Sequence, residues 1–123
     1  MTSLVIFSAN VDRMAKFYGS VLGTTSAEES SGDIRVMSQR DEVLVHSVSP
    51  KIAERITVTS PPEAREDVAI KPIFDVDSLV VAVGFVEANG GVITDRTFTL
   101  NGLVRRDVLD PDGNVIQLRS PVS

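Results

Sequence analysis

The chain has 123 residues, of which 42% are hydrophobic and 24% are charged, so we expect one compact domain with its own core rather than a disordered or fibrous chain. It contains no Cys, which excludes disulfides, thiolate metal sites and a cysteine nucleophile. The net charge of -5 disfavours nucleic acid and anionic membranes as partners. No apolar run approaches the roughly 20 residues that span a bilayer, and we expect a cytoplasmic protein.

The first part of the sequence predicts a strand, a helix and three further strands. Residues 3–8 form an apolar run typical of a buried strand, and Asn10 is a suitable N-cap for a helix over residues 11–22 that Gly23 ends. Apolar residues at spacings of three and four give this helix one apolar stripe, which needs a sheet to rest on. The strands that follow are predicted at 24–28, 34–38 and 42–48.

A polar segment covers residues 51–69. It carries many charges and the pair Pro61 and Pro62, a composition typical of a connector, although residues 56–59 are a candidate for a short extra strand. The segment therefore links two regions rather than forming one.

The second part repeats the pattern of the first. A strand at 70–76 leads to a helix over 79–88, capped by Asp77 or Ser78. The sequence Asn-Gly-Gly at 89–91 stops this helix. The strands that follow are predicted at 91–94, 103–109 and 114–119.

The repeat has a constant offset of 68 residues. It relates an apolar helix start, a phenylalanine and a glycine in the two parts: Val11 and Leu79, Phe17 and Phe85, Gly23 and Gly91. Self-similarity at a fixed offset indicates a duplicated unit, so the sequence predicts two β-α-β-β-β modules related by a pseudo-twofold axis.

Three stretches resemble the glyoxalase/bleomycin-resistance/extradiol dioxygenase (vicinal oxygen chelate) superfamily. NVDRMAKFYGSVLG is similar to its opening helix, FDVDSLVVAVGFVEANGG to the helix of its second module, and DPDGNVIQLRSP to its last turn and strand. The resemblance implies an α+β fold of two βαβββ modules whose curled mixed sheets form a cleft, often in a homodimer. The modules are then residues 1–50 and 70–123 of a single domain over residues 1–123, with 51–69 as connector.

The resemblance also implies where ligands bind. In that family His, Gln or Glu at four positions hold a divalent metal in the cleft, and these positions correspond here to Ser3, His46, Lys71 and Gln117. Lys71 follows Ser3 by 68 residues, and the endings HSVSP and QLRSP follow His46 and Gln117 in the same way. Strand alternation supports the assignment in the second module, because it places Lys71 and Gln117 on the side away from the helix.

The residues at these positions are poor ligands for a metal. A catalytic metal site needs several anionic or imidazole donors, but only His46 is a good one, and the positive charge of Lys71 repels a cation. We therefore predict that the family metal site is replaced and that no cofactor is bound. A divalent metal stays possible only if nearby carboxylates are recruited, with Glu42, Asp75 and Asp107 as the candidates.

Each of these residues also has an ordinary structural explanation. His46 fits equally well as a half-buried strand residue, and Lys71 fits better as a side chain reaching solvent than as a partner for an anionic ligand group. Gln117 suits a neutral hydrogen-bonding role. Arg105 and the residue after it are adjacent on a strand, so one side chain points to each side of the sheet. The turn at 110–114, like Phe17 and Tyr18 of the first helix, is assigned to structure rather than to a site.

These observations favour a metal-independent small-molecule-binding protein, with its ligand in a cleft between modules or between the subunits of a homodimer. The alternative is a glyoxalase-like lyase or isomerase, or a dioxygenase, with a non-standard divalent metal site. A non-catalytic dimerisation module is the third possibility.

Overall fold

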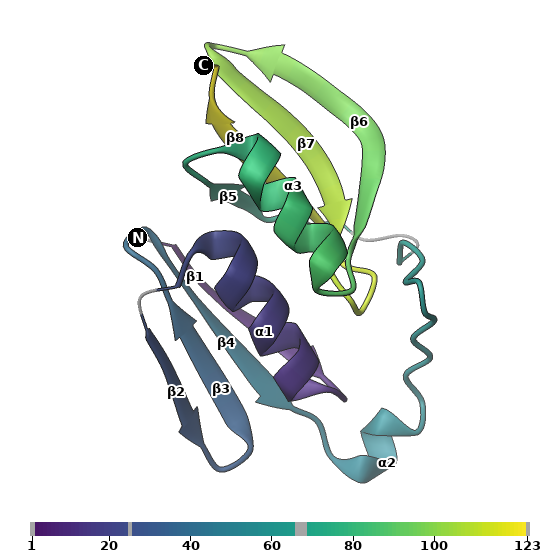
Figure 1. Cartoon of the computed structure of the whole chain (residues 1–123). Coiled ribbons are helices and arrows are strands. Elements are labelled where there is room, and N and C mark those ends of the chain that lie inside the picture. The colour runs from purple at the N-terminus through teal and green to yellow at the C-terminus, as the bar shows by residue number, and fades with distance from the viewer. Residues whose placement is uncertain (1, 25, 66–68, 123) are drawn as a thin grey trace.

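The computed structural model describes residues 2–24, 26–65 and 69–122 and contains two modules of the same topology (Figure 1). The first module holds β1 (Thr2–Ser8), α1 (Val11–Leu22), β2 (Ser26–Ser30), β3 (Asp33–Met37) and β4 (Asp41–Ser47). The second holds β5 (Ile73–Asp75), α3 (Leu79–Ala88), β6 (Val92–Leu100), β7 (Leu103–Leu109) and β8 (Val115–Pro121). Between them, the connector contains the short helix α2 (Pro50–Ala53).

Each module forms one four-stranded mixed sheet. The strand orders are β1-β4-β3-β2 and β5-β8-β7-β6. In both sheets the first pair is parallel, β1 with β4 and β5 with β8, and the other pairs are antiparallel. The predicted α+β fold of two βαβββ modules is thus confirmed.

The two helices cover one face of each sheet and contact one another at the centre of the molecule, with the connector running along the outside (Figure 1). The core lies between the helices and these covered faces, where Phe17, Tyr18, Phe74, Ile116 and Leu118 are almost fully buried. We call the other face of each sheet, which no helix covers, its open face.

Local signals set the helix ends. The Asn10 side chain accepts a hydrogen bond from the Arg13 N–H at the start of α1, and Gly23 ends that helix at φ 64. The Ser78 side chain accepts one from the Val81 N–H and caps α3. Both helices therefore begin and end where the sequence predicts.

The strands differ from the prediction at several ends. Residues 56–59 are not a strand, and β5 covers only Ile73–Asp75 of the predicted 70–76. In contrast, β6 runs to Leu100 instead of ending at residue 94. The register of β6 and β7 shifts between Ile93 and Thr97, so a bulge interrupts the regular alternation that strand prediction relies on. In the described ranges, no helix has the length and apolar character needed to cross a bilayer.

Candidate functional site

The four predicted site residues do not gather in one place. Ser3 and His46 both belong to the first sheet, but Ser3 pairs with Glu42 and His46 pairs with Phe7, four residues further along β1. Lys71 and Gln117 belong to the second sheet, where both contact Asp107. The structure thus joins the two residues of the second module and separates the two of the first.

The register also corrects the predicted equivalence of His46 and Gln117. In the first sheet Val5 pairs with Leu44, and 68 residues after Val5, Ile73 pairs with Gln117. Leu44 therefore holds the position equivalent to Gln117. Matching the endings of the two strands was misleading because the strand-to-strand connections of the modules differ in length, which changes the offset along the chain.

Asp107 is the centre of a polar cluster on the open face of the second sheet. Its side chain is only 3% exposed. Lys71 Nζ lies 3.0 Å from Asp107 Oδ2, and Gln117 Nε2 donates to Asp107 Oδ1 at 3.2 Å. A buried carboxylate needs such partners, because desolvation of an unpaired charge is very costly.

The bulge in β6 brings a further cation to this carboxylate. Thr94 Oγ1 donates to the Asp107 carbonyl at 2.6 Å and accepts from the Arg96 N–H at 3.2 Å, which fixes the bulge opposite Asp107. The Arg96 guanidinium comes within 3.9 Å of Asp107 Oδ2, although its side chain is 79% exposed. The bulge therefore directs a solvated arginine toward the cluster.

Arg105 lies on the open face beside this carboxylate, which resolves which of the adjacent arginines points there. Its Nη1 donates to Gln117 Oε1 at 3.3 Å, and its guanidinium carbon lies 6.0 Å from the centre of the Phe98 ring. The neighbouring Arg119 instead donates to Asp75 at 2.6 and 3.2 Å. These hydrogen bonds, with the charge of Arg119, hold the pKa of Asp75 below its ordinary value.

The donor set of this cluster does not fit a divalent metal. Asp107 is its one buried carboxylate, and the cation that it binds is the Lys71 ammonium. Gln117 is a weak neutral ligand. Within the described parts of the chain, no three His, Asp or Glu side chains group into a possible metal site.

His46 has its own partners on the open face of the first sheet. Its Nδ1 lies 2.6 Å from Asp33 Oδ2, and its ring makes an edge contact with Phe7, with ring centres 5.3 Å apart. The Ser47 backbone N–H donates to Asp33 Oδ1 at 2.9 Å. That bond and the His46 contact lower the pKa of Asp33.

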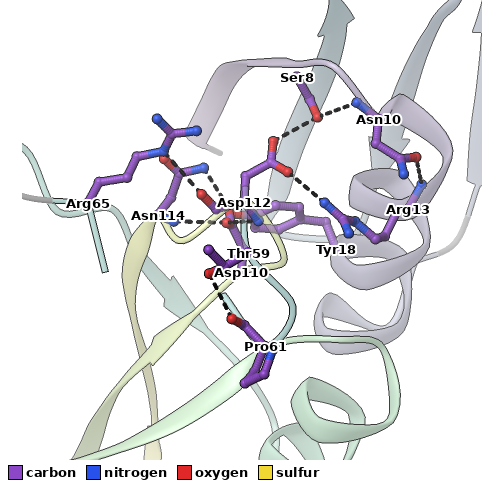
Figure 2. Close-up of polar contacts among 10 residues, drawn as sticks. All are labelled: Ser8, Asn10, Arg13, Tyr18, Thr59, Pro61, Arg65, Asp110, Asp112 and Asn114. Atoms are coloured by element: carbon purple, nitrogen blue, oxygen red, sulfur yellow. Dashed lines mark hydrogen bonds and ion pairs between the residues drawn. The ribbon is translucent and has the colours of Figure 1, made fainter. Parts of the chain in front are cut away.

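The turn at 110–114 does more than close a hairpin, because it also joins the two modules (Figure 2). Tyr18 of α1 is fully buried, and its hydroxyl donates to Asp110 Oδ2 at 2.6 Å. Asn114 donates to the same carboxylate through its backbone N–H and its side-chain amide. Burial raises the pKa of Asp110 and, together with the Asp110 charge, raises the pKa of Tyr18 well above its ordinary value.

Asp112 of the same turn makes a second link to the first module. Ser8 Oγ donates to Asp112 Oδ2 at 2.7 Å, and Arg13 pairs with Asp112 Oδ1 at 3.2 Å. The Arg65 side chain donates to the Asp112 carbonyl from the connector. The assignment of this turn to structure was thus too narrow, since its carboxylates hold α1 and the end of β1 against the second sheet.

A pocket of about 350 Å³ lies between the modules, next to this link. Both modules and the connector line it, mainly with apolar side chains, and Tyr18, Arg65 and Asn114 are its polar groups. None of the four predicted site residues lines it, but Ser3, Lys71 and Gln117 each directly adjoin a lining residue in the chain. The lining residues are Leu4, Val5, Ile6, Phe7, Tyr18, Ile56, Arg65, Ile70, Pro72, Asn114, Val115 and Ile116.

Two paired sheets of this topology define the vicinal oxygen chelate fold, and solved structures with that fold are similar to nearly the whole chain. A glyoxalase/bleomycin resistance protein from Albidiferax ferrireducens T118 has a TM-score of 0.71 and 16% identity, with 99% of this chain and 98% of that chain covered. The fosfomycin resistance protein FosX from Listeria monocytogenes has a TM-score of 0.69 and 10% identity, with 99% and 93% covered. A protein from the mobile metagenome of V. Pseudocholerae has a TM-score of 0.65 and 24% identity, with 100% and 95% covered.

No family model matches the chain, and no curated protein matches it significantly. At these low identities the likeness establishes the fold, whereas function depends on side chains that differ between proteins of one fold. The sequence resemblance to the superfamily is thus confirmed at the level of the fold.

Sequence reasoning missed two features of the site. Asp107 was named only as a possible metal recruit, although Arg105 and Asp107 are two residues apart on one strand and so share a face. The bonds from Tyr18 and Ser8 to the 110–114 turn span about 90 to 100 residues of sequence, and no local pattern signals them.

Proposed function

We propose that this chain is a metal-independent small-molecule-binding protein of the glyoxalase/bleomycin-resistance type that holds its ligand in the pocket between its modules. The pocket itself carries the proposal. Its volume of about 350 Å³ is in the range of small-molecule sites, and its mainly apolar wall with a few polar groups is the usual composition of such sites.

Metal independence is supported by the chemistry of the neighbouring cluster. A divalent cation at Asp107 would have to displace the Lys71 ammonium and accept Gln117 as a weak ligand. The test is metal analysis of protein purified without chelator. We expect substoichiometric amounts of divalent metal, and one Ni, Zn, Fe or Mn ion per chain would overturn this part of the proposal and favour the enzyme alternative.

We also propose that the protein is a homodimer that uses its open faces. Val5 and Phe7 on the first open face are 51% and 61% exposed, and Ile73 and Phe98 on the second are 40% and 48% exposed. Large apolar side chains grouped on a surface commonly mark an interface. Sedimentation equilibrium at micromolar concentration should give twice the mass of 13.2 kDa, whereas a single-chain mass would contradict the dimer.

Binding in the pocket is tested with the neutral fluorophore N-phenyl-1-naphthylamine. Its emission should rise on binding, and its binding to the native state should also raise the melting temperature. Ile70→Arg places a charge at the pocket wall and should abolish both effects.

The matched control is Val80→Arg, which makes the same kind of change at an exposed residue outside this pocket. Val80 is 82% exposed on α3, and Ile70 is 74% exposed, so both arginines reach water without disturbing the core. If Val80→Arg and Ile70→Arg weaken binding equally, the pocket is not the site.

A further inference from the structure

We propose that the ligand carries an anionic group that docks on the Arg105 guanidinium, at the open face of the second sheet, while its apolar body occupies the pocket between the modules. This inference rests on the proposed function. It adds the chemical class of the ligand, an amphipathic molecule bearing a carboxylate, sulfonate or phosphate.

The first argument is the charge of the open face. Four cationic side chains and two carboxylates belong to its polar contacts, which gives a net charge of +2 on a chain whose net charge is -5: Lys71, Arg96, Arg105 and Arg119 against Asp75 and Asp107. A local excess of positive charge in an otherwise acidic protein attracts anions selectively to that place.

The second argument is that the excess is located at Arg105. Arg119 is matched by Asp75, and Lys71 and Arg96 share Asp107. Among the residues that the structure describes, no carboxylate forms an ion pair with Arg105. The uncompensated cation of this face is therefore Arg105.

The third argument is the unused bonding capacity of Arg105. A guanidinium has five N–H donors, and here Nη1 makes one bond, at 3.3 Å, to the neutral Gln117 oxygen. Its Nε is buried without an acceptor. Phe98 holds the group from one side. The planar fork that remains is suited to an oxyanion, which accepts two parallel N–H bonds from arginine.

The fourth argument is the position of Arg105 relative to the pocket. Val115 lines the pocket, and Gln117 is two residues further along the same face of β8. Two residues of strand span roughly 7 Å. Because Arg105 contacts Gln117, one ligand about the size of a two-ring molecule can fill the pocket and reach the guanidinium.

The test compares two probes that differ by one anionic group. 8-Anilinonaphthalene-1-sulfonate has the aromatic body of N-phenyl-1-naphthylamine and adds a sulfonate. We expect the sulfonate probe to bind wild-type protein about tenfold more tightly, as for one charge-assisted hydrogen-bonded contact of about 1.4 kcal/mol. Arg105→Gln should bring the ratio of the two affinities close to one, and Arg105→Lys should give an intermediate ratio because it keeps the charge but loses the fork.

Arg35→Gln is the control. Arg35 lies on the open face of the first sheet, where Glu28 and Glu42 compensate its charge, so removing it should leave the ratio at its wild-type value. Circular dichroism melting of each variant verifies that it is folded.

The outcomes separate the two proposals. If the neutral probe does not bind wild-type protein, the proposed pocket function fails. If the neutral probe binds but the sulfonate adds no affinity, or Arg105→Gln leaves the ratio unchanged, the anionic ligand is overturned while the pocket stands. If Arg105→Gln weakens dimerisation and not the ratio, the positive charge serves the subunit contact, which also overturns this inference.

Discussion

The two modules share one strand order but differ in what their surfaces expose. Helix α1 buries one side, and the phenylalanine at its centre, Phe17, is fully inaccessible to solvent. Helix α3 is apolar on nearly every side, and Phe85, at the repeat position of Phe17, is 44% exposed. A helix that is apolar all round is usually buried on all sides, so α3 has an apolar surface that the first module lacks.

The open faces differ in charge. On the first sheet three carboxylates accompany one arginine, a net charge of -2 with His46 neutral: Glu28, Asp33 and Glu42 with Arg35. On the second sheet the net charge is +2. The repeat thus conserves where an element lies, while the role of the side chain at each repeat position has changed.

The largest effect is expected from the two phenylalanines. Phe17→Ala removes a fully buried ring that packs edge-on against Tyr18, and should lower the free energy of unfolding by about 3 to 5 kcal/mol. Phe85→Ala removes a half-exposed ring and should cost about 1 kcal/mol. Urea unfolding of both variants measures this, and equal losses would mean that the repeat positions have equivalent roles after all.

The paired glycines should also differ. A Cβ on Gly91 would lie 2.5 Å from the Leu109 carbonyl oxygen and 2.6 Å from the Phe17 ring, and because the carbonyl cannot move aside, Gly91→Ala should cost about 3 kcal/mol. Gly23 has open space but a φ of +64, so Gly23→Ala meets only backbone strain of about 1 kcal/mol. The melting temperatures of the two variants should therefore fall by clearly different amounts, and the reverse order would refute the close packing at Gly91.

The next effect concerns the bond between the modules. Tyr18→Phe deletes the hydroxyl that donates to Asp110 and leaves a buried carboxylate oxygen with one donor fewer, at a cost of about 2 kcal/mol. Thr59→Val, which removes an exposed hydroxyl bond to the Pro61 carbonyl, serves as the control and should have little effect. Chemical denaturation at pH 7 measures both. A tyrosine variant as stable as the wild type would show that this bond contributes nothing.

The smallest effect is expected from the ion pair on the first open face. The folded-state pKa of Asp33 is lowered, so its ionised form stabilises the folded chain above the unfolded pKa, and that contribution disappears as pH falls through the lowered folded pKa. Asp33→Asn should therefore be less stable than wild type at pH 7, and the difference should shrink toward pH 3. A difference that is constant with pH would exclude the titration of Asp33 as its source.

Local signals made the helices predictable, and long-range pairing limited the rest. Asn10, Ser78 and Gly23 determine helix ends through bonds within a few residues, so both helices were placed at their observed bounds. The second half of β6 was missed because the bulge after Ile93 breaks the period-two pattern. The unpredicted length of this strand is what places Arg96 and Phe98 opposite β7.

The site was less predictable than the fold because it depends on register. Alternation correctly placed Gln117 on the open face, with Ile116 and Leu118 in the core. Which residue lies opposite Gln117 depends on how β7 and β8 align, and that alignment brings Asp107 to it. The same dependence on register explains why His46 was paired with Gln117 in the sequence, although Leu44 holds the equivalent position.

The bonds from Tyr18 and Ser8 to the 110–114 turn have a consequence for how the chain is assembled. Each module has a complete sheet, yet each also contains polar groups that are satisfied only by the other: the Tyr18 hydroxyl in the first, and the Asp110 and Asp112 carboxylates in the second. A chain severed in the connector would give two pieces that each expose or bury an unpaired group. The two halves are thus expected to unfold in one transition and, after cleavage, to regain structure only when mixed.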